Sequence, residues 1–233
     1  SMKLSQRLCE YTIVEAGFGS DLGGEKFIDI VTRIGDLKVD VAVIVATIRA
    51  LKLHGGAPEK DISAGTIDHL RKGLSNLGKH IENMRKFNVP PGVAINVFKD
   101  DTDEEIGVVK EFCQAQNTPV AETRVFAQGG VGALALADII ADCTQKEESR
   151  MKPIYELEDP VEDKLETVAR DIYGASGVIY TTSAERDIRR ITKFGLDKLP
   201  VCIAKTNSSL SDDPKLLGRP ENFKITIHGV NIS

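Results

Sequence analysis

The stretch Val93-Ala-Ile-Asn-Val-Phe-Lys-Asp-Asp-Thr-Asp-Glu-Glu105 decides the fold. It begins as an extended apolar run, which ends in Phe98 and opens into a polar helix start. Thr102 and Glu105 have the spacing of a capping box, in which each side chain accepts a hydrogen bond from the backbone of the other residue. The stretch therefore predicts a strand that is followed directly by a helix.

The same order recurs along the chain, because apolar runs rich in β-branched residues alternate with helical patterns. Strands are predicted at residues 11–14, 40–46, 92–97, 119–125, 177–180 and 200–204, with a weaker one at 223–230. Helices are predicted at residues 25–33, 64–87, 103–116, 130–146, 161–173 and 184–194. This alternation predicts an α/β fold with a mostly parallel, doubly wound sheet and helices on both faces.

A polar stretch at residues 145–155 interrupts the apolar periodicity and contains a proline. It predicts a boundary near residue 150, between one α/β lobe of residues 3–149 and a second, incomplete lobe of residues 150–233. Asp159-Pro160 with Glu162 predicts a further capping box at the next helix start. Ser1-Met2 resembles a remnant of cloning and is left out of the fold prediction.

Three aromatic residues, Phe18, Phe98 and Phe126, are expected at one edge of the sheet. Phe18 belongs to the stretch Glu15-Ala-Gly-Phe-Gly-Ser-Asp-Leu-Gly-Gly-Glu-Lys-Phe27, and Phe126 precedes a second glycine-rich stretch. Ligands of open α/β sheets bind at the carboxyl ends of the strands. A ring there either packs into the core or offers a stacking surface to a flat ligand, and the pattern alone leaves both possibilities open.

Several polar groups are candidates for contacts with an anion or a nucleotide. Gly129 and Gly130 precede a predicted helix, and helix N-termini bind anions through free N–H groups. A tight turn between strand and helix needs the same glycines. His54 stands before two glycines, and Lys205 follows a predicted strand. A simple turn and a structural role remain open for these two residues.

Composition limits the classes of function. The chain has 233 residues, a formal net charge of −5 and no basic stripe, so nucleic acid is not expected as a partner. No apolar run approaches the ~18 residues of a membrane helix. The four cysteines are scattered without a CxxC pair, which argues against a zinc site and predicts buried thiols in a reducing compartment. The cytoplasm is favoured over the mitochondrial matrix.

Together these segments resemble formate–tetrahydrofolate ligase, also called 10-formyltetrahydrofolate synthetase, alone or as the synthetase domain of C1-tetrahydrofolate synthases. The resemblance covers essentially the whole chain. It is carried by residues 15–27, 45–56, 96–102, 126–132, 162–178, 199–206 and 211–218. It implies a ligase of one-carbon metabolism that forms formyl phosphate from formate and ATP, with Mg²⁺ on the nucleotide. The formyl group then passes to N10 of tetrahydrofolate.

The resemblance also implies roles for particular residues. Phe18, Phe98 and Phe126 would stack on the folate rings, and the last of them stands where the family usually has Trp. Asp101 and Thr102 would form a polar wall beside the folate, although both residue types also favour a plain helix start. Lys99 and Asp100 depart from the family's Pro and Thr.

The chain lacks the phosphate-binding run G-x-x-x-x-G-K-[ST]. The resemblance places that run upstream of the Glu15–Phe27 stretch, so this sequence is expected to be an internal fragment without catalytic residues or a bound metal of its own. The alternative is a non-catalytic, synthetase-like module for folate binding or assembly. A fragment with bare apolar surface is expected to self-associate, as a homo-oligomer or less specifically.

Overall fold

The structure, a computed structural model, describes residues 1–146 and 148–232, without the side chains of residues 62–64. Residue 147, inside the stretch predicted as a boundary, lies outside the description. Contacts divide the chain into two compact units. Unit 1 comprises Ser1–Lys38, Lys152–Leu216 and Pro220–Ser233, and unit 2 comprises Val39–Met151 and Leu217–Arg219.

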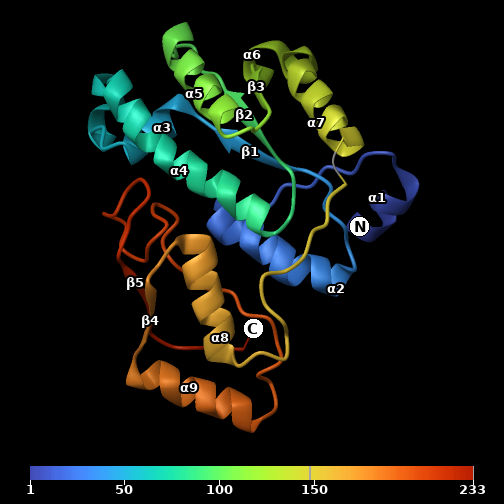
Figure 1. Ribbon diagram of the computed structural model, residues 1–233, viewed down its shortest axis with the longest axis vertical. Coiled ribbons are helices and arrows are strands. Elements are labelled where there is room, and N and C mark those ends of the chain that lie inside the picture. The colour runs from blue at the N-terminus through green and yellow to red at the C-terminus, as the bar shows by residue number, and fades with distance from the viewer. Residues whose placement is uncertain (147, 233) are drawn as a thin grey trace. The chain divides into compact units, whose positions relative to one another are not determined.

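A three-stranded parallel sheet forms the centre of unit 2 (Figure 1). Its strands are β1 (Ala42–Ala46), β2 (Pro91–Asn96) and β3 (Val120–Thr123), in the order β1-β2-β3. Ile44 pairs in register with Val93, and Val93 with Val120. These side chains share one face of the sheet, because side chains alternate between the two faces along each strand. The predicted parallel α/β sheet is confirmed.

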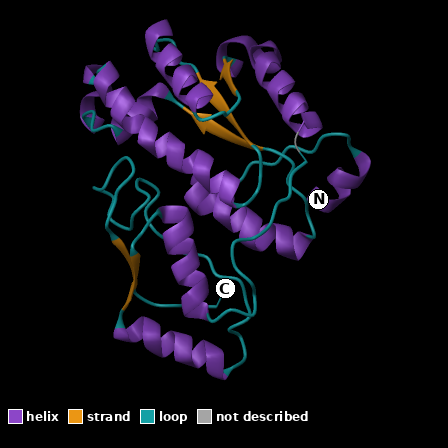
Figure 2. Cartoon of the chain, viewed as in Figure 1, coloured by secondary structure: helices purple, strands orange, loops and turns teal. Residues whose placement is uncertain are grey.

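Helices cover both faces of this sheet (Figure 2). The helical elements of unit 2 are α3 (Ile48–His54), η3 (Glu59–Ala64), α4 (Ile67–Lys86), α5 (Asp103–Ala115), α6 (Val125–Gln128), η4 (Gly129–Ala133) and α7 (Leu134–Lys146). α4 and α5 pack on the face that carries Val93 and Ile95. α7 packs on the opposite face over β2 and β3, where Gly92 faces Ile139.

The apolar stripe of α4 supplies much of the core of unit 2. Its members Leu70, Leu74, Leu77, Ile81 and Met84 are all buried. They repeat at intervals of three and four residues, so they lie on one side of the helix. The first four pack with the buried side chains of β2 and α5. The helical spacing of these residues therefore marks the core face of α4.

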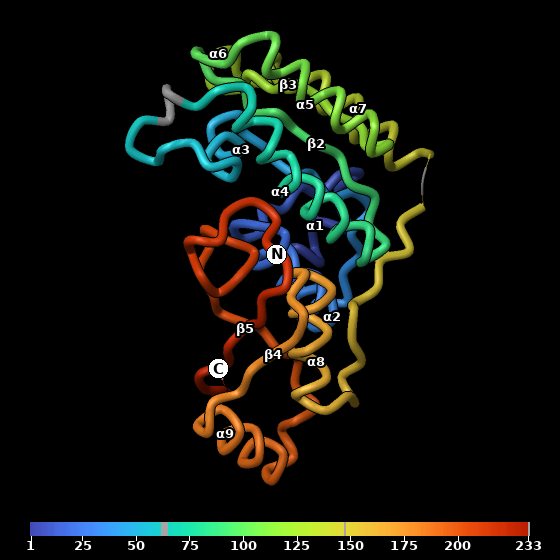
Figure 3. The backbone as a smooth tube through the Cα atoms, turned by 60° about the vertical axis from the view of Figure 1, so that its left-hand side comes forward, coloured from blue at the N-terminus to red at the C-terminus, as the bar shows by residue number. Residues whose placement is uncertain are grey.

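α3 and α4 touch backbone to backbone, and they lie side by side in Figure 3. A Cβ atom built on Gly73 would lie 1.8 Å from the carbonyl oxygen of Leu51. Only glycine fits such a close approach. The side chain of Thr47 caps α3 by accepting a hydrogen bond from the amide of Ala50 at 3.1 Å. α3 is thus fixed against the core helix of the unit.

In unit 1, a helical segment runs from Gly19 to Gly35 through η1 (Gly19–Gly24), η2 (Phe27–Thr32) and α2 (Arg33–Gly35). It begins six residues before the predicted start at Glu25. Most of its first two turns have the wider π-helical bonding pattern. A Cβ atom on Gly23 would lie 1.9 Å from the carbonyl oxygen of Gly17, so the glycines let the preceding loop fold back onto the helix.

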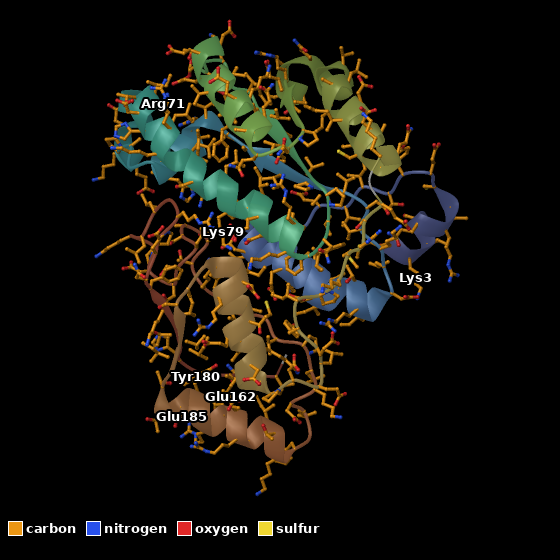
Figure 4. All side chains as sticks on the ribbon, viewed as in Figure 1. Lys3, Arg71, Lys79, Glu162, Tyr180 and Glu185 are labelled. Carbon is orange, nitrogen blue, oxygen red and sulfur yellow. The ribbon has the colours of Figure 1, made fainter. Side chains whose placement is uncertain are left out.

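The remaining elements of unit 1 are α1 (Met2–Leu8), α8 (Val161–Thr167) continued by η5 (Val168–Tyr173), β4 (Gly177–Tyr180), α9 (Thr182–Lys193) and β5 (Lys224–Ile227). β4 and β5 pair in parallel, with Gly177 opposite Lys224. Tyr180 lies close to Glu162 of α8 (Figure 4), and its hydroxyl donates to the carbonyl of Glu162 at 3.3 Å. Burial raises the pKa of Tyr180 to about 12.

Three of the strand predictions need correction. Residues 11–14 form no strand, and their apolar side chains Tyr11, Ile13 and Val14 are exposed instead of packed on a sheet. Residues 200–204 form no strand either, because the Tyr155 hydroxyl bonds both the N–H and the carbonyl of Val201. β3 ends at Thr123, where the amide of the next residue turns away to donate to a glycine carbonyl in η4.

Two smaller predictions are also wrong. The second capping box is absent, since Pro160 is the N-cap of α8 and Asp159 accepts a hydrogen bond from Glu156. The prediction of buried thiols is also wrong in part. Cys113 is buried, but Cys9 and Cys202 are exposed.

One segment among the described residues, Val125–Lys146, could cross a membrane by its length and composition. The segment is divided into α6, η4 and α7. α7 has 13 residues and spans about 20 Å, whereas the hydrocarbon core of a bilayer is about 30 Å thick. This is weak support for a membrane span, and the absence of a membrane partner stays a prediction.

Candidate functional site

The carboxyl edge of the unit 2 sheet carries two of the three predicted aromatic residues. Phe98 follows β2 and Phe126 follows β3, and these strands are neighbours. Phe98 is 44% exposed, and Phe126 is fully exposed. Neither ring is a plug in the core of unit 2. Both rings are exposed at the carboxyl edge of one parallel sheet, where ligands of α/β sheets bind, and stacking of a flat ligand on them stays a prediction.

A short turn positions Phe98. The carboxylate of Asp101 accepts a hydrogen bond from the amide of Phe98 at 2.8 Å, and the amide of Asp101 donates to the carbonyl of Phe98 at 3.1 Å. Thr102 is the N-cap of α5 and forms the predicted capping box with Glu105. Asp101 and Thr102 therefore hold the turn together, and a contact between them and a ligand stays a prediction.

Phe18 belongs to unit 1. It is the N-cap of η1 and is 74% exposed. Its carbonyl accepts a hydrogen bond from the amide of Gly23 at 3.2 Å, which closes the glycine-rich loop. Phe18 does not follow a strand as expected, although its ring is presented to solvent as a stacking role requires.

The predicted anion-contact residues of unit 2 differ in their surroundings. Gly129 and Gly130 are exposed, and a Cβ atom on either would meet nothing within 4 Å. His54 ends α3, and its Nδ1 accepts a hydrogen bond from the amide of Gly218 at 3.3 Å. The same Gly218 accepts a bond from the side chain of Asn76 at 3.0 Å. In this arrangement His54 anchors a distant chain segment.

Lys205 lies in the interior of unit 1, where its side chain is 1% exposed. Its Nζ is 2.6 Å from the carboxylate of Asp21 and also donates to the carbonyls of Thr206 and Ser209. It lies over the ring of Tyr173, 4.9 Å from the centroid. Its charge is thus already paired within the protein, and contact between Lys205 and an anionic ligand stays a prediction.

A pair of buried acids in unit 1 escaped the sequence analysis. Glu25 and Asp29 stand one helical turn apart and are 1% and 0% exposed. Burial, followed by the nearby charge of Asp29, raises the pKa of Glu25 to about 9. Burial also raises the pKa of Asp29 to about 6, against the effect of a hydrogen bond from the amide of Ile154. The sequence does contain a sign of this pair, because two acids four residues apart in Glu25-Lys-Phe-Ile-Asp29 lie on the same side of a helix.

A hollow of about 600 Å³ lies at the opposite, amino edge of the unit 2 sheet. It is lined by Pro91, Pro119 and Ile139, together with charged residues such as Arg85 and Asp142. Neither Phe98 nor Phe126 lines it. No group of three or more metal-binding side chains occurs among the residues that the structure describes.

These features define a parallel α/β protein whose candidate ligand edge carries aromatic rings. The family model described as formate–tetrahydrofolate ligase matches residues 1–233. The chain therefore belongs to the formate–tetrahydrofolate ligase family, a family of ligases of one-carbon metabolism whose substrates are formate, tetrahydrofolate and ATP.

Proposed function

We propose that this chain provides folate-binding residues of an enzyme that joins formate to tetrahydrofolate. In the proposed reaction, a formate oxygen attacks the γ-phosphorus of Mg²⁺-bound ATP, which gives formyl phosphate and ADP. N10 of tetrahydrofolate then attacks the formyl carbon, phosphate leaves and the proton of N10 is released, which gives 10-formyltetrahydrofolate. The exposure of Phe98 and Phe126 at the ends of neighbouring strands carries the proposal, because flat pterin and aminobenzoyl rings need such faces.

We expect tetrahydrofolate to bind the 233-residue chain saturably. Replacing Phe98 or Phe126 with alanine should weaken binding by about tenfold each, since each change removes a stacking face. Isothermal titration calorimetry measures the dissociation constants. Phe194→Ala is the matched control, because Phe194 is 65% exposed at the end of α9 and has no proposed role. Absence of binding by the unchanged chain, or equal losses in the control, would contradict the proposal.

The chain by itself is proposed to be inactive towards ATP. Phosphoryl transfer depends on backbone N–H groups, a lysine and Mg²⁺ that hold the phosphates, and the sequence contains no run with the spacing that provides them. Formate-dependent release of ADP by the purified chain would overturn the proposal that it is inactive towards ATP. The proposal that it binds folate would still be tested separately by the titration.

An assembly role is the second candidate, and a particular surface favours it. Val43 and Val45 on β1 are 38% and 65% exposed, on the face of the sheet where α7 packs over β2 and β3. Parallel sheets are normally covered on both faces. We expect static light scattering to detect self-association that Val45→Lys weakens. A monomer at high concentration would count against this role.

A further inference from the structure

A buried ion pair links α3 to the first turn of α5 in unit 2. The Nζ of Lys52 lies 2.5 Å from Oε1 of Glu105, and the two side chains are 14% and 10% exposed. Burial favours the neutral form of Glu105, but the contacts with Lys52 and the amide of Thr102 outweigh it and lower the pKa of Glu105 below its usual value. Glu105 is therefore ionised at neutral pH.

Glu105 is at the same time the capping residue of α5. Its second oxygen, Oε2, accepts a hydrogen bond from the amide of Thr102 at 3.1 Å. One carboxylate thus binds Lys52 with one oxygen and the start of α5 with the other. A carboxylate held at both oxygens loses the freedom to swing away from the helix end.

The chain of contacts continues to the exposed ring. Thr102 follows Asp101, whose carboxylate accepts the hydrogen bond from the amide of Phe98. The residues from Phe98 to Thr102 therefore form one turn, tied at its carboxyl end to Lys52 through Glu105. Lys52 itself sits on a helix that is pressed against α4 at Gly73. Thr102 also binds α5 through its hydroxyl, which accepts from the amide of Glu105 at 3.3 Å, and through its carbonyl, which accepts from the amide of Ile106 at 3.0 Å. Lys52 adds a charged contact from α3 to this helix start.

We propose that Lys52 is a positioning residue that fixes the Phe98–Thr102 turn, and so the angle of the Phe98 ring, through its ion pair with Glu105. The consequence for tetrahydrofolate rests on the proposed function, whereas the positioning of the turn does not. Lysine suits this role because its long apolar stem can be buried while its ammonium group reaches the carboxylate.

The first arm of the test needs no ligand. The chain contains no Trp, so Phe98→Trp introduces a single fluorescent reporter on the turn. We expect Lys52→Met in this background to lower the steady-state anisotropy of the Trp and to raise its quenching by acrylamide. Lys52→Arg should restore both values, because it keeps the charge. Lys110→Met is the matched control, since Lys110 of α5 forms a 2.6 Å ion pair with Glu122 of β3. Equal anisotropy in Lys52→Met and the parent would overturn the proposal.

The second arm measures tetrahydrofolate binding to the chain with Phe98 intact. Lys52→Met should weaken binding by about tenfold, because misplacing a contact group by a fraction of an ångström removes much of its interaction. The double variant Lys52→Met/Glu105→Gln should bind tetrahydrofolate about as weakly as Lys52→Met alone, since both substitutions break the same ion pair. Unchanged affinity in Lys52→Met would overturn the link to folate. If the unchanged chain binds no folate, the proposed function fails, and the fluorescence arm still decides the role of Lys52.

Discussion

Replacing Glu25 with glutamine is expected to remove most of the loss of stability that unit 1 suffers as the pH rises from about 6.5 to 8.5. The folded-state pKa of Glu25 is raised to about 9 from a usual value of 4.5. A raised pKa means that the folded chain holds a proton that the unfolded chain has released. The stability linked to this proton is therefore complete below about pH 4.5 and is lost as the pH rises through 9.

The loss amounts to about 1.4 kcal/mol for each pH unit within that window, or several kcal/mol in total. Glutamine has nearly the same shape and cannot ionise, so it removes the contribution of Glu25, whereas Asp29, with a pKa of about 6, changes at lower pH. Urea unfolding at pH 6.5, 7.5 and 8.5 measures the slope. Glu221→Gln is the control at an exposed site of the same unit. Parallel slopes for Glu25→Gln and the unchanged chain would refute the assignment.

Replacing Gly73 with alanine is expected to destabilise unit 2 by about 3 kcal/mol or more, the upper range for overpacking. The new Cβ would lie 1.8 Å from the carbonyl oxygen of Leu51, and backbone cannot move away as a flexible side chain can. α3 and α4 must therefore separate. The gain of about 1 kcal/mol in helix propensity from glycine to alanine is too small to offset this.

Gly107→Ala in α5 is the matched control, because a Cβ atom on Gly107 meets nothing within 4 Å. It should stabilise the chain by about 0.5–1 kcal/mol through helix propensity alone. The same substitution in two helices of one unit is thus expected to have opposite signs, which thermal or urea unfolding can establish. A neutral Gly73→Ala would mean that the two helices are not held in backbone contact.

The sequence predicted best where local pattern and tertiary packing agree. The strand at residues 177–180 has the predicted bounds, and α5 begins at Asp103 as its capping box indicates. The stripe of α4 is core because its spacing matches the helical period. In each case the structure is determined by residues that lie close together in the sequence.

The failures have non-local causes. The apolar run at residues 200–204 resembles a strand, but the hydroxyl of Tyr155, distant in sequence, takes the backbone groups of Val201. The helix was predicted to start at Glu25 and not at Gly19, because the glycines at 19, 23 and 24 normally break helices, and only the close approach of Gly23 to Gly17 shows why they are tolerated.

The features of the candidate site also differ in whether the sequence predicted them. The exposed rings of Phe98 and Phe126 were expected at the strand ends. The ion pair of Lys52 was not foreseen, because its partner Glu105 is contributed by another helix.

The parallel pairing of the strands has a consequence for how the chain reaches this structure. Residue 42 pairs with residue 91, and residue 177 with residue 224, so among the residues that the structure describes no strand meets its partner through a hairpin. Each pairing must wait until a long intervening segment has closed into a loop, which slows folding relative to proteins rich in local contacts. During that interval the helices form first and the strand edges stay open, and nascent chains of this kind are at greatest risk of aggregation before their first crossover is complete.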